Sequence, residues 1–543
     1  MTMTVHQTAP FAGQKPGTSG LRKKTKVFMQ EHFLENFIQA TFDAVGGVGG
    51  KTLVLGGDGR FFGQEASQTI LKMAAANGAA RVIVGRNAWL STPAASNLIR
   101  VRKTDGGIIL SASHNPGGIE EDFGVKYNAE NGGPAPESIT SKIYEITETI
   151  SEYKKMDVDD VNLDELGEVD LGGMTVEVID PVSAYADMME GIFDFDALKA
   201  MFANGFKMRM DSMCAITGPY AVEIFENRLG ADKGTVTHAV PLPDFGGMHP
   251  DPNPTWAHEL MDELMGTNAP AFGAASDGDG DRNMILGAGT YVSPSDSLAV
   301  IAANAQLVPA YAQGLKGVAR SMPTSAAVDR VAEALGVDCF ETPTGWKFFG
   351  NLMDAGRVSL CGEESFGTGS DHVREKDGLW AVLMWLNIIA KRGQTVSEIL
   401  ADHFARFGRN YYSRHDYEAL PTEQAEGMLA DLRDRLKELP GREVCGLIVS
   451  NADEFSYTDP VDGSVSSGQG FRILFSGGSR VVLRLSGTGT EGATLRVYLE
   501  RYVPGPDGLT EDPQEALGPI IAATEEIVGI TATTGRAKPD VIT

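Results

Sequence analysis

Short β-type runs alternate with helical patterns along most of the chain. Residues 52–55 predict a strand that runs into a turn at 56–59, residues 64–77 predict a helix, and residues 80–84 predict the next strand. Residues 269–275 predict a buried strand after a helix whose apolar face comprises Trp256, Leu260, Met261, Leu264 and Met265. This alternation is typical of layered α/β domains.

The C-terminal part has a different pattern. One amphipathic helix is predicted by the spacing of Met428, Leu429, Leu432, Leu436 and Leu439. Residues 481–485 and 493–500 predict strands, which together indicate a smaller α+β domain. We therefore expect an α/β multidomain protein divided into residues 1–185, 186–305, 306–408 and 409–543. The acidic stretch 156–173 is predicted to be a solvated connector.

Composition and charge exclude several classes of protein. The 543 residues suggest three or four domains, and a content of 42% hydrophobic and 22% charged residues excludes a disordered chain. The 46 Lys and Arg residues against 73 Asp and Glu residues give a net charge of −27. Because nucleic acids and anionic membranes select basic surfaces, neither is an expected partner.

The expected compartment is the cytoplasm. The N-terminal residues contain no secretory signal, and the longest apolar stretch, 381–390, is too short to span a bilayer. Four cysteines lie far apart without a CxxC pair, so zinc binding and redox chemistry have no support. We expect all four to be buried free thiols, namely Cys214, Cys339, Cys361 and Cys445.

The first candidate for chemistry is the stretch 107–118. A buried strand ends at Ser111 and leads Ser113, His114 and Asn115 into a turn closed by proline and glycines. A serine at the carboxyl end of a strand, beside a histidine, can present its hydroxyl to a ligand. The alternative is an ordinary turn of Ser, Asn, Pro and Gly. A hydrolase nucleophile elbow is not supported, because G-x-S-x-G is absent.

The second candidate is the acidic loop 276–282. Asp277, Asp279 and Asp281 alternate with glycines directly after a predicted buried strand. Carboxylates this close repel one another unless a cation neutralises them, and hard oxygen ligands suit Mg²⁺. An EF-hand is excluded, because its sixth position is Arg282 and its twelfth is Ala288. A surface Asp-Gly turn is the alternative.

Two further loops are weaker signals. In one, Glu363 and Ser365 would bind sugar hydroxyls while Arg374 and Lys376 would meet a phosphate, although a solvated loop explains it nearly as well. In the other, hydroxyls and glycine amides at 484–490 form a potential anion-binding nest, or else a plain hairpin loop.

One apparent nucleotide motif is rejected. Residues 45–52 resemble a P-loop, but the required first glycine is Val45 and a strand follows where a helix should begin. The sequence therefore predicts no ATP site there.

These loops, together with residues 17–23 and 342–350, occur in the order and spacing of the α-D-phosphohexomutases. The chain resembles the long, glucose-specific branch of that family from about Gly17 to Glu500. The resemblance implies three related α/β domains with mixed sheets and a C-terminal α+β domain around a central cleft. It also implies Mg²⁺-dependent interconversion of glucose 1-phosphate and glucose 6-phosphate, with glucose 1,6-bisphosphate as intermediate and activator.

Residue roles follow from the same resemblance. Ser113 would be the phosphorylated serine and would join Asp277, Asp279 and Asp281 around Mg²⁺. Lys126 resembles a lysine considered for proton transfer, with His114 as the alternative. The implied substrate contacts are Thr18, Arg22, Asp281, Arg282, Thr344, Gly345, Glu363, Ser365, Lys376, Arg484, Ser486, Gly487, Thr488 and Arg496.

Two rival functions remain open. A sister mutase acting on mannose or N-acetylglucosamine phosphates would share the Ser113 and aspartate loops, whereas a non-catalytic sugar-phosphate binding protein would need neither. The expected partners are small-molecule sugar phosphates, with no nucleic acid, no membrane and no obligate protein partner. Since an acidic chain must then bind an anion, we expect an acidic exterior around a cationic cleft. The cations within the motifs are Arg22, Lys23, Lys126, Arg282, Lys347, Arg374, Lys376, Arg484 and Arg496.

Overall fold

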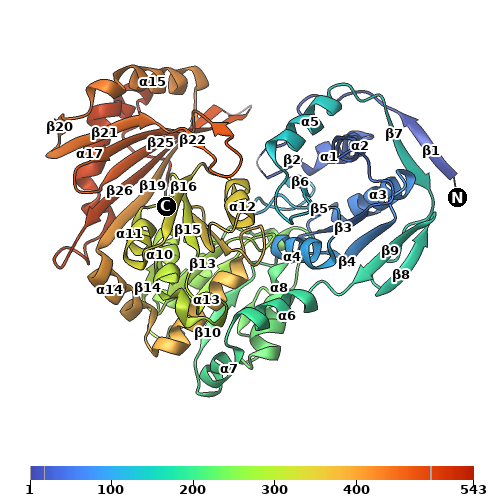
Figure 1. Cartoon of the computed structure of the whole chain (residues 1–543), viewed down its shortest axis with the longest axis horizontal. Coiled ribbons are helices and arrows are strands. Elements are labelled where there is room, and N and C mark those ends of the chain that lie inside the picture. The colour runs from blue at the N-terminus through green and yellow to red at the C-terminus, as the bar shows by residue number, and fades with distance from the viewer. Residues whose placement is uncertain (1, 18, 490–491) are drawn as a thin grey trace.

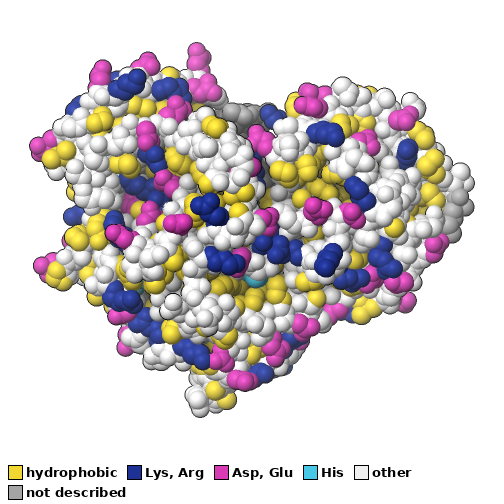
Figure 2. All heavy atoms as spheres, viewed as in Figure 1, with side chains coloured by type: hydrophobic (Ala, Val, Ile, Leu, Met, Phe, Trp, Pro, Cys, Tyr) yellow, Lys and Arg dark blue, Asp and Glu magenta, His cyan; other side chains and the backbone are white. Residues whose placement is uncertain are grey.

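The computed structural model describes residues 2–17, 19–489 and 492–543, with only the backbone for residues 486–489. Its four main sheets define four domains in chain order. The first and fourth domains stand at opposite ends of the molecule, and the second and third lie between them (Figure 1). The space-filling view shows the surface hollowed between the two ends (Figure 2).

The first domain contains a mixed seven-stranded sheet in the order β2-β6-β5-β3-β4-β9-β8. Its strands are β2 (Leu21–Lys24), β3 (Thr52–Gly57), β4 (Arg81–Trp89), β5 (Gly107–Leu110), β6 (Asp122–Asn128), β8 (Gly167–Leu171) and β9 (Met174–Ile179). Its helices are α1 (Thr25–Phe28), α2 (Phe33–Ala44), α3 (Gly63–Ala76), α4 (Thr92–Arg102) and α5 (Glu137–Thr147). β1 (Thr2–Gln7) pairs separately with β7 (Glu152–Asp157).

The second and third domains have smaller mixed sheets. The second has β10 (Met208–Asp211), β11 (Val236–Thr237), β12 (Phe272–Ser276), β13 (Asn283–Gly287) and β14 (Thr290–Val292), with α6 (Ser183–Ile192), α7 (Phe195–Ala203), α8 (Thr217–Ala221) and α9 (His258–Met265). The third has β15 (Gly317–Ser321), β16 (Asp338–Thr342), β17 (Leu360–Glu363) and β18 (Gly367–Ser370), with α10 (Pro294–Asn304), α11 (Ala327–Leu335), α12 (Trp346–Asp354), α13 (Gly378–Arg392) and α14 (Val396–Phe407).

The fourth domain differs because its seven-stranded sheet is antiparallel throughout. Its strands are β19 (Arg409–Leu420), β20 (Glu443–Val444), β21 (Leu447–Glu454), β24 (Phe471–Phe475), β25 (Arg480–Gly489), β26 (Gly492–Val503) and β27 (Val541–Ile542), and β22 (Tyr457–Thr458) pairs with β23 (Val465–Ser466). Its helices are α15 (Thr422–Arg435), α16 (Pro513–Ala516), α17 (Gly518–Val528) and α18 (Ile530–Thr534). The predicted α/β multidomain architecture with a C-terminal α+β domain is confirmed.

One four-strand pattern recurs in the first three domains. The orders β4-β3-β5-β6, β11-β10-β12-β13 and β16-β15-β17-β18 each contain two parallel pairings followed by one antiparallel pairing. The loop between the third and fourth strands carries Ser113 in the first domain, the three aspartates in the second and Ser365 in the third. The repeated topology therefore gives these three candidate loops the same place in their sheets, at the carboxyl end of a parallel strand.

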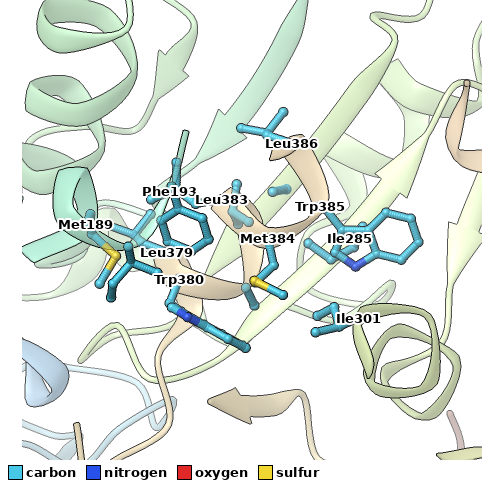
Figure 3. Packing of buried hydrophobic residues seen from close by; sticks show 14 of the residues in the cluster. Met189, Phe193, Ile285, Ile301, Leu379, Trp380, Leu383, Met384, Trp385 and Leu386 are labelled. Atoms are coloured by element: carbon cyan, nitrogen blue, oxygen red, sulfur yellow. The ribbon is translucent and has the colours of Figure 1, made fainter. Parts of the chain in front are cut away.

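The largest core is built around α13, whose residues from Gly378 to Ile389 are buried. Figure 3 shows its side chains packed among residues of the second and third domains. Trp380 and Trp385 are fully buried, and their indole N–H groups donate to Tyr311 Oη at 3.0 Å and Ser297 Oγ at 2.9 Å. The apolar stretch 381–390 is therefore a core helix, and in the described ranges no helix is long and apolar enough to cross a membrane.

Some predicted elements require correction. α9 begins at His258, so Trp256 precedes it and is 47% exposed; Met265 is 42% exposed. Leu260 and Leu264 are the buried residues of this helix, and they lie on the side that packs against β12 and β13.

The acidic stretch 156–173 is also more than a connector. It includes the edge strand β8, and Val161, Leu163 and Leu171 are buried in the first domain's core while the charged positions remain exposed. All four cysteines are free thiols, as predicted, but they are not all buried. Cys361 is buried, Cys214 and Cys339 are half-buried, and Cys445 is exposed because it lies in the turn between β20 and β21.

Candidate active site

Ser113 lies in the loop after β5, where its backbone is left-handed with a φ of 54°. Non-glycine residues rarely adopt this conformation, and such strain is concentrated at functional sites. The Ser113 hydroxyl donates a hydrogen bond of 2.9 Å to Asp277 Oδ2 and lies 3.3 Å from His114 Nδ1. The serine loop and the aspartate loop are therefore in direct contact, although they are 164 residues apart.

The three aspartates converge as the sequence predicted. Asp277 and Asp279 are fully buried, Asp281 is 4% exposed, and one carboxylate oxygen from each lies within 4.8 Å of the others. In the described part of the chain, Asp279 Oδ1 and Asp281 Oδ1 are buried and accept no hydrogen bond. Because buried carboxylate oxygens need a compensating partner, this donor set fits a hard divalent cation such as Mg²⁺.

Two lysines approach the same carboxylates. Lys126 Nζ donates to Asp279 Oδ2 and to Thr92 Oγ1, each at 2.9 Å, and the Thr92 hydroxyl donates to Asp279 Oδ2 at 2.7 Å. Lys376 Nζ lies 3.3 Å from Asp281 Oδ1. The first and third domains thus each bring a cation to the acidic loop of the second.

The electrostatic environment shifts the pKa values of these groups in different directions. Burial raises the pKa of Asp277 well above its usual range, and the charges of Asp279 and Asp281 raise it further. Burial would raise the pKa of Asp279 too, but the Lys126 ammonium lowers it below its usual value. Burial likewise opposes the charge of Lys126, yet Asp279 leaves the lysine's pKa raised. The pKa of His114 is lowered well below 6.5, first by burial and then by Arg282 and Arg22.

Arg22 and Arg282 surround this cluster from two domains. Arg22 is half-buried on β2, and its Nε has no hydrogen-bond partner among the residues that the structure describes. The Arg282 backbone N–H donates to Asp277 Oδ1 at 3.0 Å, while its side chain pairs with Asp251 at 3.2 Å. The Arg282 Nε is also buried without a partner, which leaves donors of both arginines available to an anion.

The predicted sugar loop lies beside the metal loop. Glu363 is 6% exposed and its Oε1 accepts a hydrogen bond of 3.0 Å from the Gly345 backbone N–H, while Ser365 is half-buried. Thr344 Oγ1 is buried without a partner. An isolated antiparallel bridge between Arg282 and Gly367 joins the two loops directly.

The fourth domain contributes two arginines. Arg484 on β25 lies directly opposite Arg496 on β26, and both are half-buried. Because like charges directly opposite one another destabilise a sheet, this pair fits an anion site. Ser486, Gly487 and Thr488 belong to β25, but their side chains lie outside the described part, as does the whole of Thr18.

Not every predicted cation faces a ligand site. Arg374 is 6% exposed and donates to Asp354 at the end of α12, at 2.6 Å, and to the carbonyls of Asp371 and Val373 in its own loop. Its guanidinium therefore bonds groups of the third domain instead of a phosphate. Lys347 pairs with Glu137 at 2.9 Å, across from the third domain to the first.

The sequence analysis missed Thr92 and Arg60. Thr92 holds Asp279, and the guanidinium of Arg60 donates to the Ser113 carbonyl at 2.9 Å. Both residues follow the carboxyl ends of parallel strands, β4 and β3. That position is the signal that would have found them, since it also singled out Ser113.

Family models match the chain in four consecutive parts. Phosphoglucomutase/phosphomannomutase alpha/beta/alpha domains I, II and III match residues 13–154, 183–289 and 294–407. Residues 409–540 match the C-terminal domain of phosphoglucomutase-1. These matches account for most of the chain.

Known proteins match over the full length. A phosphoglucomutase of Rhizobium radiobacter is 60% identical over 99% of both chains, and a chloroplastic phosphoglucomutase of Arabidopsis thaliana is 53% identical over 99% of this chain and 88% of its own. The open form of Paramecium parafusin, a phosphoglucomutase, has a TM-score of 0.93 at 47% identity and covers 100% of this chain and 99% of its own. The chain therefore belongs to the phosphoglucomutase/phosphomannomutase family.

Proposed function

We propose that this chain is a phosphoglucomutase, an intramolecular phosphotransferase that interconverts α-D-glucose 1-phosphate and glucose 6-phosphate. The relatives at 53% and 60% identity carry that name. The observation that carries the proposal is the Ser113 hydroxyl, which lies 2.9 Å from Asp277 at the edge of a buried three-aspartate cluster. This arrangement suits a serine that accepts and returns a phosphoryl group.

The reaction would proceed in two reciprocal transfers. In the first, the bond between the Ser113 oxygen and phosphorus breaks while a hydroxyl oxygen of glucose phosphate bonds to that phosphorus and loses its proton. The product is glucose 1,6-bisphosphate. After the bisphosphate turns over, the Ser113 oxygen attacks its other phosphate, and the proton returns to the sugar oxygen. Mg²⁺ on Asp277, Asp279, Asp281 and the Ser113 oxygen would neutralise charge on the phosphoryl group.

Lys126 and His114 are the proposed proton carriers. The Lys126 ammonium is fixed by two hydrogen bonds, to Asp279 and Thr92, so it has a defined position beside the aspartate cluster. The His114 ring nitrogen is nearer the Ser113 oxygen, at 3.3 Å. We place Lys126 first because it lies at the aspartate cluster itself, and separate Lys126→Ala and His114→Ala variants distinguish the two.

Substrate would be held by opposite ends of the site. Glu363 and Ser365 would bind the sugar hydroxyls, and Arg484 and Arg496 would bind the phosphate that is not reacting. The remaining proposed contacts are Thr18, Arg22, Asp281, Arg282, Thr344, Gly345, Lys376, Ser486, Gly487 and Thr488. Because the phosphates of the bisphosphate exchange places, the sugar site must accept two orientations.

Glucose phosphate is the proposed substrate class, and the cytoplasm the proposed compartment. Full-length relatives at 52% identity include a probable cytoplasmic phosphoglucomutase, and chloroplastic relatives also exist. A mutase acting on mannose phosphate would use the same serine and aspartate loops, so a panel of hexose phosphates decides between them. A binding protein without catalysis would have no use for the strained, aspartate-bonded Ser113.

Replacement of Ser113 tests the proposal. Ser113→Ala is expected to lower kcat by roughly 10⁴-fold or more, since the hydroxyl proposed to carry the phosphate is gone, while glucose phosphate still binds. Ser67→Ala, which removes a buried serine hydroxyl that bonds the Gly63 carbonyl on α3, is the matched control and should retain activity. Intact mass measures phosphate on each variant after treatment with glucose 1,6-bisphosphate. Normal turnover by Ser113→Ala would overturn the proposed function.

A further inference from the structure

Both backbone polar groups of Ser113 are held by buried side chains. Its N–H donates to Ser111 Oγ at 2.7 Å, and its carbonyl accepts from Arg60 Nη2 at 2.9 Å. Ser111 is fully buried and Arg60 is 2% exposed. A residue with an unfavourable φ keeps it only where its surroundings determine the backbone, and these two contacts do so for Ser113.

Asp58 lies at the centre of this support. Arg60 Nε approaches both Asp58 carboxylate oxygens, at 2.9 and 3.1 Å, and the pair is 0% and 1% exposed in its side chains. Burial raises the pKa of the Asp58 carboxyl, and the Arg60 guanidinium and the Ser111 hydroxyl both act against that rise. The Asp58 carboxylate therefore orients the guanidinium that bonds the Ser113 carbonyl.

The position of this pair follows from the sheet. Asp58 and Arg60 come directly after β3, which pairs in parallel with β5, the strand that precedes the Ser113 loop. The Arg60 Nη1 also donates to the Asp122 carbonyl at 2.7 Å, at the start of β6. Arg60 thus joins the serine loop to the start of β6.

The remaining side of the Ser113 carbonyl is closed by the aspartate loop. A Cβ on Gly278 would lie 2.4 Å from the Ser113 oxygen, so the two backbones touch there and only glycine fits. Arg60 supplies a charged donor to this crowded carbonyl. If the guanidinium were lost, the buried carbonyl would lose that donor and the left-handed backbone would be free to relax, moving the hydroxyl away from Asp277.

We propose that Asp58 and Arg60 are positioning residues for Ser113, which hold its backbone so that its hydroxyl faces the aspartate cluster and the substrate. The proposal rests on the proposed function, because it assigns these residues to the serine that carries the phosphate. A purely structural role is the alternative, in which the pair stabilises the first domain without affecting phosphoryl transfer.

The test compares two arginines in the full-length protein. Arg60→Lys keeps the charge but cannot bond Asp58 and both carbonyls together. Arg392→Lys is the control, because Arg392 at the end of α13 is half-buried and bonds Asp402, Asn304 and Gln394 outside the site. The measurements are single-turnover phosphorylation of dephosphorylated protein by glucose 1,6-bisphosphate, followed by intact mass, together with kcat, KM, Tm and the ³¹P resonance of the phosphoserine.

We expect Arg60→Lys to slow phosphorylation and kcat by about 100-fold, since a displacement of about 1 Å costs that much. KM should stay within about twofold and the ³¹P resonance should move. Arg392→Lys should leave the phosphorylation rate and the resonance as in the parent. Ser111→Ala removes the acceptor of the Ser113 N–H and should slow phosphorylation by about tenfold. If Arg60→Lys does not fold, this variant tests the positioning role.

The outcomes separate the two proposals. If Ser113→Ala is inactive but Arg60→Lys or folded Ser111→Ala is phosphorylated at the parent rate, the positioning role is wrong and the proposed function stands. Equal slowing in Arg60→Lys and Arg392→Lys, with matching losses of Tm, also overturns it. If Ser113→Ala turns over normally, the proposed function itself fails.

Discussion

His403 is a buried titratable residue outside the active site. It lies on α14 with 3% exposure, its ring packs beside Phe404 and Phe407, and its Nδ1 has no hydrogen-bond partner. Burial lowers its pKa to about 4, and Arg406 adds to the effect. A histidine held neutral in this way binds a proton more weakly in the folded chain than in the unfolded one.

This residue is expected to reduce stability in acid. Because the folded pKa lies below the unfolded value of about 6.5, the contribution is fully present above pH 6.5 and is lost as the pH falls toward 4. Between pH 7 and pH 4.5 the loss is about 2 kcal/mol. His403→Leu removes it, so thermal denaturation of this variant should be less acid-sensitive than that of the parent. His258→Leu, at an exposed histidine, is the control, and equal acid sensitivity of all three proteins would contradict the assignment.

Whether a residue of the candidate site could be predicted depends on how far along the sequence its partner lies. Ser113 and the three aspartates could be predicted from local pattern, because each follows the carboxyl end of a strand. Thr92 also follows the end of a strand, but its bond to Asp279 spans 187 residues, and no local pattern shows that partner. Arg374 was misassigned for the same reason: its partner, Asp354, lies on another element.

At the scale of elements, the loop between β12 and β13 could hold a cation. It holds three buried carboxylates within 4.8 Å, next to one lysine on Asp279 and another on Asp281. Among the described residues no donor bonds Asp279 Oδ1 or Asp281 Oδ1, so both oxygens are available as metal ligands. A divalent cation that binds only the folded loop must therefore stabilise the protein.

Addition of Mg²⁺ is accordingly expected to raise Tm by about 5 °C at saturating concentration. Asp281→Asn removes one negative charge from the loop and should shrink this shift, whereas Asp170→Asn on the exposed strand β8 should leave it unchanged. Differential scanning calorimetry at constant ionic strength measures the shift. A Tm that does not respond to Mg²⁺ in the parent protein would rule out the loop as its site.

The positions of strands and helices were easier to predict than the elements against which they pack or pair. β3, α3, β12 and β26 all occur close to where the periodicity placed them. On β26 the pattern could not show that Tyr498 and Glu500 are buried, because the third domain covers that face. The pairing of β5 with β3 likewise depends on strands some 50 residues apart, which no local period encodes.

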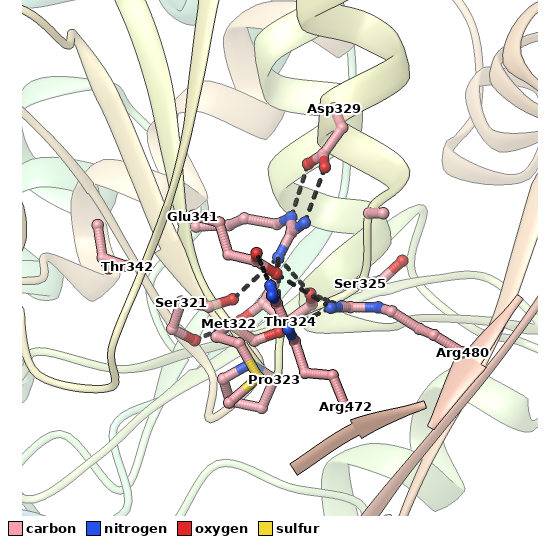
Figure 4. Close-up of polar contacts among 12 residues, drawn as sticks. Ser321, Met322, Pro323, Thr324, Ser325, Asp329, Glu341, Thr342, Arg472 and Arg480 are labelled. Atoms are coloured by element: carbon pink, nitrogen blue, oxygen red, sulfur yellow. Dashed lines mark hydrogen bonds and ion pairs between the residues drawn. The ribbon is translucent and has the colours of Figure 1, made fainter. Parts of the chain in front are cut away.

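At the scale of the whole molecule, charged side chains join the third domain to the fourth. Figure 4 shows Glu341, Arg472 and Arg480 in one cluster with Asp329 nearby. Arg320 donates to both Glu341 and Asp329. Arg480 donates to the carbonyls of Met322 and Thr324 in the third domain and to Glu341. The fourth domain carries Arg484 and Arg496, so this junction sets where the proposed phosphate site stands relative to Ser113.

Glu500 is the anion on which this junction depends. It is 1% exposed, and it accepts from Arg480 Nε at 2.5 Å, from Ser325 Oγ at 2.7 Å and from the Ala326 N–H at 2.9 Å. Neutralising it leaves Arg480 buried beside a group without charge, and breaking a buried pair costs about 3–5 kcal/mol. Glu500→Gln should therefore weaken the contact between the two domains while the fourth domain's own sheet remains.

Loss of the Arg480–Glu500 pair should also affect activity, because the pair lies at the junction between the third and fourth domains. If the junction orients the arginines that bind the distal phosphate, Glu500→Gln raises KM for glucose 1-phosphate about tenfold or more and makes the fourth domain unfold as a separate calorimetric transition. Glu454→Gln removes an ion pair with Arg433 on the outside of the same domain and should change neither. A Glu500→Gln protein with parental KM and a single transition would show that the fourth domain is positioned by its apolar contacts alone, and that the buried charges at the junction only neutralise one another.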